Sequence, residues 1–193
     1  MIDLDETIEE GGLKLEFYLD DDPENPRKYW DEVGIMACFH NRYSLGDKTE
    51  ITADMFSGWD EMENYIIKKL KAIVVLPLYL YDHSGITMST SPFACKWDSG
   101  QVGFIYATRE SVKKLMGWPR ISAKRLKKVE EILQGEVKEY DAYLTGEVYG
   151  WRVKNEYDDV LESCCGYLIV TDKDEKRFIE EAKEGLKNCR EAS

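Results

Sequence analysis

Residues 74–90 read VVLPLYLYDHSGITMST, which is an apolar run, a polar turn and a second run of strand-forming residues. The residues Asp82 to Gly85 have the turn-forming composition that joins two antiparallel strands. Pro77 lacks a backbone N–H, so it indicates a bulge or an edge position in the first strand. A further strand is expected at residues 101–108, after the turn-like sequence of residues 97–100. This stretch therefore predicts an antiparallel sheet.

Helical periodicity occurs on both sides of this stretch. Apolar residues recur at three- and four-residue steps in residues 59–72, 122–144 and 172–189, and a short helix is expected at residues 109–116. Strand character is expected at residues 13–19, 33–40, 147–154 and 166–170, and residues 1–12 are expected to form a mobile lead-in. The pattern predicts an α+β fold in which a meandering, antiparallel β-sheet is flanked by helices.

The length of 193 residues, with 43% hydrophobic residues, suits one domain of ordinary size. We expect an acidic N-terminal segment, residues 1–30, followed by a single α+β domain, residues 31–193. The longest apolar run, residues 72–81, is far shorter than the roughly 20 residues that cross a bilayer. The acidic N-terminus also lacks the pattern of a signal peptide, so a cytoplasmic location is expected.

Acidic residues are concentrated at the start of the chain. The net charge is −12, and residues 1–60 hold 16 acidic residues against 5 basic ones. An acidic surface repels free nucleic acid but complements the basic channel of a nucleic-acid enzyme. Alternatively, these acids only keep the surface solvated. The candidate partner-binding residues are Asp20, Asp21, Asp22, Glu24, Asp31 and Glu32.

Basic residues are concentrated in residues 109–128, which contain eight of them and the single acid Glu110. Such a strip can contact phosphates, although a solvated helix face is the simpler interpretation. The candidate nucleic-acid contacts are Arg120, Lys124, Arg125, Lys127 and Lys128.

Two turns, residues 82–85 and 97–100, combine His, Asp, Ser and Gly. If both lie at the same end of the sheet, His83 lies near Asp98. A histidine oriented by a carboxylate and close to a serine is the starting point of a hydrolase. Asp82, His83 and Asp98 can equally hold a divalent metal ion. Turns also use these residue types for local backbone hydrogen bonds, so all three interpretations stay open.

The five cysteines include no Cys-x-x-Cys pair, and the chain has no glycine-rich nucleotide-binding motif. We therefore expect no structural metal and no cofactor. A nucleophilic cysteine would depend on His40 or His83, the two histidines of the chain. Reduced, buried thiols are the expected state.

Four strings resemble a family of small proteins encoded by bacteriophages and mobile elements. They are LPLYLYDHSGITM at 76–88, WDSGQVGFIY at 97–106, GEV at 135–137 and YDAYLTGEVYG at 140–150. Small acidic phage proteins often inhibit host defence, so the resemblance implies an anti-CRISPR-like inhibitor. It would bind a bacterial Cas nuclease or its guide-RNA complex stoichiometrically, as a DNA mimic, in the cytoplasm of the bacterial host.

Two other functions are compatible with the sequence. One is a hydrolase or nuclease that uses His83 with Asp82 or Asp98, and the other is an accessory phage protein. An inhibitor needs no catalytic residues, so on the leading hypothesis the protein is not an enzyme.

Overall fold

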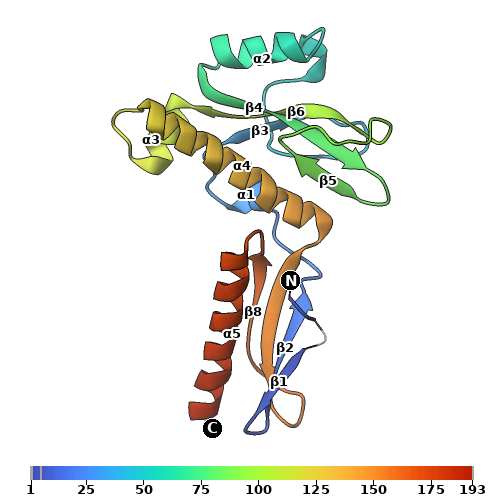
Figure 1. Ribbon diagram of the computed structural model, residues 1–193, viewed down its shortest axis with the longest axis vertical. Helices are drawn as coiled ribbons and strands as arrows, with labels where there is room; N and C mark the ends of the chain where they lie inside the picture. The colour runs from blue at the N-terminus through green and yellow to red at the C-terminus, as the bar shows by residue number, and fades with distance from the viewer. Residues whose placement is uncertain (1, 5, 193) are drawn as a thin grey trace. The chain divides into compact units, whose positions relative to one another are not determined.

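The computed structural model describes residues 2–4 and 6–192. These residues form an α+β fold with two antiparallel sheets (Figure 1), which confirms the predicted fold class. The strands divide between two separate sheets. The elements in chain order are β1 (Thr7–Glu10), β2 (Leu13–Leu19), α1 (Pro26–Tyr29), β3 (Ile35–Cys38), the 3-10 helix η1 (Ala53–Met55), α2 (Trp59–Lys68), β4 (Ala72–Asp82), β5 (Ile86–Ser89), β6 (Ser99–Thr108), α3 (Arg109–Met116), α4 (Ala123–Thr145), β7 (Val148–Lys154), β8 (Val160–Leu168) and α5 (Asp172–Glu191).

The chain forms two compact units. Unit 1 comprises residues 1–24 and 142–193, and unit 2 comprises residues 25–141. This division differs from the expected one, an acidic segment of residues 1–30 followed by one domain of residues 31–193. Of that acidic segment, Met1 and Asp5 lie outside the described residues. The remainder of residues 1–24 is part of a unit that also contains residues 142–193.

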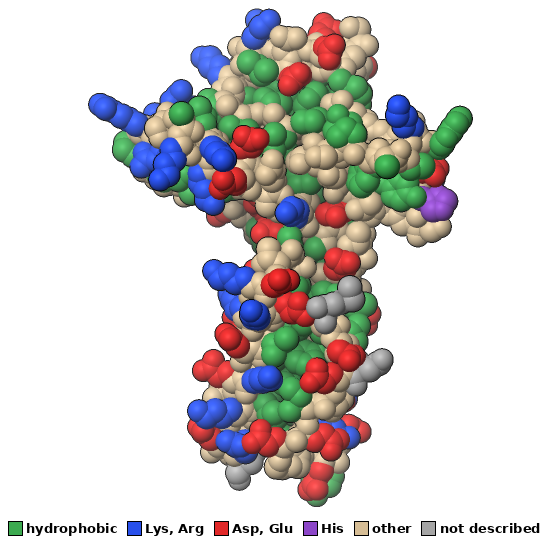
Figure 2. Space-filling model, in the orientation of Figure 1, with side chains coloured by type: hydrophobic (Ala, Val, Ile, Leu, Met, Phe, Trp, Pro, Cys, Tyr) green, Lys and Arg blue, Asp and Glu red, His purple; other side chains and the backbone are tan. Residues whose placement is uncertain are grey.

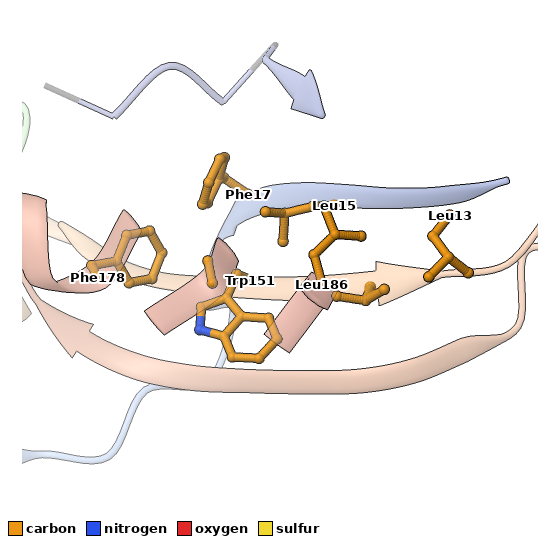
Figure 3. Packing of buried hydrophobic residues seen from close by; sticks show 8 residues of the cluster. Leu13, Leu15, Phe17, Trp151, Phe178 and Leu186 are labelled. Atoms are coloured by element: carbon orange, nitrogen blue, oxygen red, sulfur yellow. The ribbon is translucent and has the colours of Figure 1, made fainter. Parts of the chain in front are cut away.

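Unit 1 is a four-stranded sheet, in the order β1-β2-β7-β8, with α5 packed against one face. Alternate residues of β2, namely Leu13, Leu15 and Phe17, point toward the helix because successive strand residues face opposite sides. In α5, Phe178, Ala182 and Leu186 are four residues apart and share one helix face. Figure 3 shows the resulting core, with Trp151 of β7 among these side chains.

Two local expectations for unit 1 were wrong. Residues 7–10 form β1, because their backbone pairs with β2 from Thr7 to Glu10. The strand expected at 166–170 is β8, which begins six residues earlier at Val160 and pairs with β7 despite its irregular pattern. Helix α5 has Thr171 as its N-cap, with Asp174 completing the capping box.

Unit 2 contains the second sheet, in the order β3-β6-β4-β5, and the predicted hairpin is its β4-β5 pair. Pro77 lies in β4 opposite Phe104, outside the part of β4 that pairs with β5. At this position β4 has no partner strand on the β5 side, so the missing N–H of Pro77 costs no ladder hydrogen bond on that side. The predicted edge position is therefore confirmed. One face of this sheet packs against α2, through residues such as Phe104 and Ile66.

Gly34 lies against α4, on the side of unit 2 away from α2. A Cβ placed on it would come within 2.5 Å of the Leu133 Cδ2 atom and 2.8 Å of the Ile105 Cδ1 atom. Helix α4 begins after Ser122, whose hydroxyl accepts the Arg125 N–H at 3.4 Å, and it ends before the left-handed Gly146. The helix thus lies within one residue of the expected range, 122–144. Within residues 2–4 and 6–192, no helix combines the length and apolar character needed to cross a lipid bilayer.

Candidate functional site

The two polar turns of the sequence meet at one end of the unit 2 sheet. The Asp82 N–H donates to the Asp98 carbonyl at 2.8 Å, because Asp82 ends β4 and Asp98 immediately precedes β6. The His83 Nδ1 atom is 3.3 Å from the Asp98 Oδ2 atom. The predicted proximity of His83 and Asp98 is therefore confirmed. Ser84 supports the turn with a left-handed backbone, φ 59°.

Other side chains complete this end of the sheet. Arg42 forms an ion pair with Asp82, and the Tyr43 hydroxyl donates to the second Asp82 oxygen at 3.3 Å. The His83 ring stacks on Tyr81 with 6.0 Å between centroids. A hollow of about 360 Å³ lies beside these residues. Its lining comprises Phe39, His40, Asn41, Arg42, Leu80, Asp82, Trp97, Asp98, Ser99, Gly100, Gln101 and Val102.

The arrangement contains a histidine–carboxylate pair without an aligned nucleophile. The Ser99 hydroxyl donates to the Cys95 carbonyl and so is engaged away from His83. The Asp82 carboxylate forms an ion pair with Arg42 and accepts a hydrogen bond from Tyr43. The His83 and Asp98 side chains are 64% and 40% exposed, so water screens their interaction. This geometry pairs His83 with a carboxylate, but Ser99 does not complete a hydrolase triad with the pair.

Metal binding by the same residues is not supported. Among the described residues, no group of three or more His, Cys, Asp and Glu side chains is placed to hold a metal ion. The described geometry therefore does not favour a divalent cation held by Asp82, His83 and Asp98. The reason is geometric, because Asp82 faces Arg42 while Asp98 faces His83.

The cysteines of the described chain are free thiols. Burial, followed by the nearby Asp47 carboxylate, raises the pKa of Cys38 to about 12. Partial desolvation and the nearby Asp20 carboxylate raise the pKa of Cys165, and partial desolvation and Glu162 raise that of Cys189. A raised pKa disfavours the thiolate that a nucleophilic cysteine requires. The expectation of buried thiols fails for Cys164 and Cys165, which are exposed on β8.

The six candidate acidic residues are divided between the two units. Asp20, Asp21, Asp22 and Glu24 belong to unit 1, whereas Asp31 and Glu32 belong to unit 2. Asp21, Asp22, Glu24 and Asp31 are exposed, while Asp20 is half-buried and accepts the Asp22 N–H at 3.1 Å. The Glu32 side chain is only 14% exposed. Glu32 therefore does not fit an exposed anionic surface.

The excess negative charge of the protein lies in unit 1. Residues 1–24 and 142–193 contain 22 acidic residues and 9 basic ones, a net charge of −13. Residues 25–141 contain 16 acidic and 17 basic residues, a net charge of +1. Figure 2 shows acidic side chains over the surface of unit 1. Strand pairing of β2 with β7 thus joins the acidic N-terminal residues to the C-terminal part of the chain in one body.

Glu32 belongs to a buried charge network that the sequence analysis missed. Arg27 is at its centre, with a side chain only 2% exposed. Its guanidinium donates to the two Asp47 carboxylate oxygens at 3.0 and 2.6 Å, to Glu136 at 3.2 Å and to the Gly34 carbonyl at 2.6 Å. The Glu136 carboxylate also accepts the backbone N–H groups of Val33 and Gly34.

This network changes the charge state of Glu32. Burial, followed by repulsion from Glu136, raises the pKa of Glu32 to about 8. At neutral pH its carboxyl group is then mostly protonated and contributes little negative charge. No local motif indicates the network, because Arg27 and Glu136 are 109 residues apart in sequence.

The candidate basic residues lie together at the start of α4 and just before it. Arg120, Lys124, Lys127 and Lys128 are exposed, and Figure 2 shows Lys and Arg side chains gathered over α3 and this end of α4. Arg125 is half-buried; its guanidinium lies 5.0 Å from the Trp118 ring centroid and donates to the Arg120 carbonyl at 2.5 Å. Lys128 is 3.3 Å from Glu131. Arg120, Lys124 and Lys127 are therefore the members best placed to contact phosphates.

Comparison with known proteins found no matching family model, no matching curated protein and no matching solved structure. Function must therefore be argued from the geometry and the charge of the described residues.

Proposed function

We propose that the protein is a phage-encoded inhibitor of a bacterial defence nuclease. It would act in the host cytoplasm by binding a Cas nuclease, or its guide-RNA complex, in a stoichiometric complex that blocks DNA binding or cleavage. The observation that carries this proposal is the separation of charge between the two units, −13 in unit 1 and +1 in unit 2. The resemblance of four sequence strings to phage proteins supplies the expected class of target.

The charge of unit 1 supports binding to a basic surface. Carboxylates attached to a folded sheet and helix are held in position. Their electrostatic field therefore has a fixed direction, and little conformational entropy is lost on binding. They can compete with DNA phosphates for the lysines and arginines of a nuclease channel. Asp21, Asp22 and Glu24 are the exposed candidates next to the end of β2. Asp20 supports this loop through its bond to the Asp22 N–H.

The basic strip suggests a second contact in the same complex. Arg120, Lys124 and Lys127 are exposed in unit 2 and can bind the phosphates of guide RNA or DNA. A protein with one acidic and one basic surface can contact both parts of a nuclease–RNA complex. Contacts of either kind would weaken as the salt concentration rises.

The test is a titration of the purified protein into target-DNA cleavage by a guide-loaded type II CRISPR nuclease. Inhibition should be complete near one inhibitor per nuclease. The double variant Asp21→Lys and Asp22→Lys should weaken it and reduce its salt dependence. The matched control is Glu180→Lys with Glu184→Lys, two exposed positions of α5 that change the net charge of unit 1 equally.

If both double variants lose inhibition equally, only the overall charge of unit 1 matters for binding. Unchanged inhibition in the first variant would reject Asp21 and Asp22 as the binding surface. Absence of inhibition by the wild-type protein would remove this target and leave other defence enzymes, or an accessory phage protein, as the alternatives.

A hydrolase or nuclease is the second candidate, and the 3.3 Å contact between His83 and Asp98 favours it. An enzyme would act far below one molecule per target, whereas an inhibitor would not. His83→Ala should abolish such activity and leave folding unchanged, because the His83 side chain is 64% exposed. Full inhibition by His83→Ala at equal stoichiometry would exclude this candidate.

A further inference from the structure

The unit 1 sheet ends on a long strand, β8, whose outer edge faces away from the rest of the sheet. In the order β1-β2-β7-β8, β8 is the last strand, and its partner among the described residues is β7. It has nine residues, and Val160 and Leu161 at its start are 52% and 46% exposed. An edge strand presents a row of N–H and C=O groups with which another strand can pair.

The other three sheet edges of the described chain have features that oppose strand addition. Strand β1 has only four residues, and short edge strands offer few pairing groups. At the β5 edge, the Met88 N–H donates to the Asp141 carboxylate at 2.6 Å. At the β3 edge, the Met36 N–H donates to the Asp47 carboxylate at 2.7 Å, and the Met36 carbonyl accepts the Asp47 N–H at 2.8 Å. Strand β8 is therefore the edge best suited to pairing.

The sequence of β8, VLESCCGYL, lacks the residues that commonly protect an edge. Lysine and proline at edge positions hinder pairing with another chain, and β8 contains neither. The centre of the strand is regular, with Ser163 opposite Arg152 and Cys164 opposite Trp151. The register shifts of the β7-β8 pair lie on either side of this centre. An added strand would thus find a regular backbone along the middle of β8.

The surroundings of β8 are acidic. Residues 155–172, which contain β8 and its flanks, include five acidic residues and no Lys or Arg. The Cys165 thiol of β8 lies beside Asp20, since partial desolvation and then this carboxylate raise the pKa of the thiol. The two basic residues of the adjacent strand β7 both pair with Glu16, so their charge is already compensated. A segment that adds to β8 therefore meets negative charge.

We propose that β8 binds an extended, basic segment of a partner protein, which pairs with it as a fifth strand of the unit 1 sheet. Backbone hydrogen bonds supply affinity in this mode of recognition, and the alternate side chains of the added strand supply specificity. Lys and Arg side chains of that strand would meet the carboxylates around β8.

Charge favours such a segment over other occupants. A second copy of the chain would bring another unit 1, and two units at −13 repel each other. Nucleic acid is repelled by the same charge and has no peptide backbone to continue the sheet. Binding of a basic strand requires no nuclease, so it can be tested apart from the proposed function, and either can fail without the other.

The experiment is fluorescence anisotropy of a labelled short peptide of alternating lysine and valine, titrated with the full chain up to about 1 mM. The wild-type protein should bind this peptide. The same peptide methylated at every backbone nitrogen keeps its side chains and charge but has no N–H donors, so it should bind at least about tenfold more weakly. A peptide of alternating glutamate and valine should also bind at least about tenfold more weakly, because its charge is repelled.

Two protein variants locate the binding edge. Ser163→Lys places a positive charge at the exposed centre of β8 and should weaken binding of the lysine–valine peptide at least about fivefold. Thr7→Lys is the matched control, because it adds the same charge at an exposed hydroxyl residue of β1, the opposite edge of the same sheet. It should leave binding close to that of the wild-type protein, and circular dichroism should show both variants folded.

Hydrogen exchange of the complex provides the direct readout, since pairing should slow exchange in residues 160–168. A wild-type protein that does not bind the lysine–valine peptide would overturn the proposal. Equal binding of the methylated peptide, or an equal effect of Thr7→Lys, would overturn it as well. Protection of residues 160–168 that rises with protein concentration in the absence of peptide would identify a second copy as the occupant and contradict it.

Discussion

Replacing Arg27 by alanine should destabilise unit 2 more than any substitution of a surface arginine. The variant leaves the buried carboxylate of Glu136 and the half-buried carboxylate of Asp47 without the guanidinium that contacts both. The side chains of Arg27 and Glu136 are only 2% and 5% exposed, so water cannot replace the lost partner. Breaking a buried ion pair by removing one member costs about 3–5 kcal/mol. The free energy of unfolding should fall by that amount.

The assay is urea unfolding followed by tryptophan fluorescence, since four of the five tryptophans lie in unit 2. With a urea dependence of about 2 kcal/mol per molar, the midpoint should fall by about 2 M. Arg42→Ala is the matched control, because Arg42 pairs with Asp82 but is 66% exposed. It should cost less than about 1 kcal/mol. If the two variants lose equal stability, the buried network does not hold unit 2 together.

Three further predictions concern stability. The ordinary pKa of a glutamate is 4.5, and that of Glu32 in the folded protein is raised to about 8. Because the folded state holds this proton more tightly, the free energy of unfolding should fall as pH rises from 4.5 to about 8. Glu32→Gln should reduce this pH dependence. It should raise the free energy of unfolding by about 1–3 kcal/mol at pH 7 and change it little at pH 4. Gly34→Ala should cost about 1–3 kcal/mol in calorimetry, because its Cβ would lie 2.7 Å from the Glu136 carboxylate. Phe178→Ala should cost unit 1 about 3–5 kcal/mol in urea unfolding, since Phe178 is fully buried.

Elements with a regular pattern could be predicted from the sequence. The alternation of residues 13–19 and the helical spacing of residues 122–144 are local properties, and both elements formed where expected. The division into two sheets could not be predicted in the same way. It depends on β2 pairing with β7, where Leu15 lies opposite Val153. Nothing within either strand specifies so distant a partner, because both are hydrophobic strands with similar alternation.

The same distinction applies to the candidate site. His83 and Asp98 occur in turns that flank strands of one hairpin region, so their proximity followed from local turn chemistry. The partners of Arg27 come from the segment after β3 and from α4, so composition does not indicate them. Trp97 was part of a predicted turn, but its exposure depends on how that turn is placed.

The location of the charge supports the proposed binding function over the proposed catalytic alternative. Had residues 1–24 been a free acidic tail, their charge would have implied solubility and little else. Strand pairing instead attaches them to β7 and to a unit that carries a net charge of −13. Repulsion among so many carboxylates opposes folding of that unit. A basic partner would relieve this repulsion, so the free energy that the acids cost in the free protein would be recovered on binding. The exposed His83–Asp98 pair offers no comparable gain, because solvent screens it already.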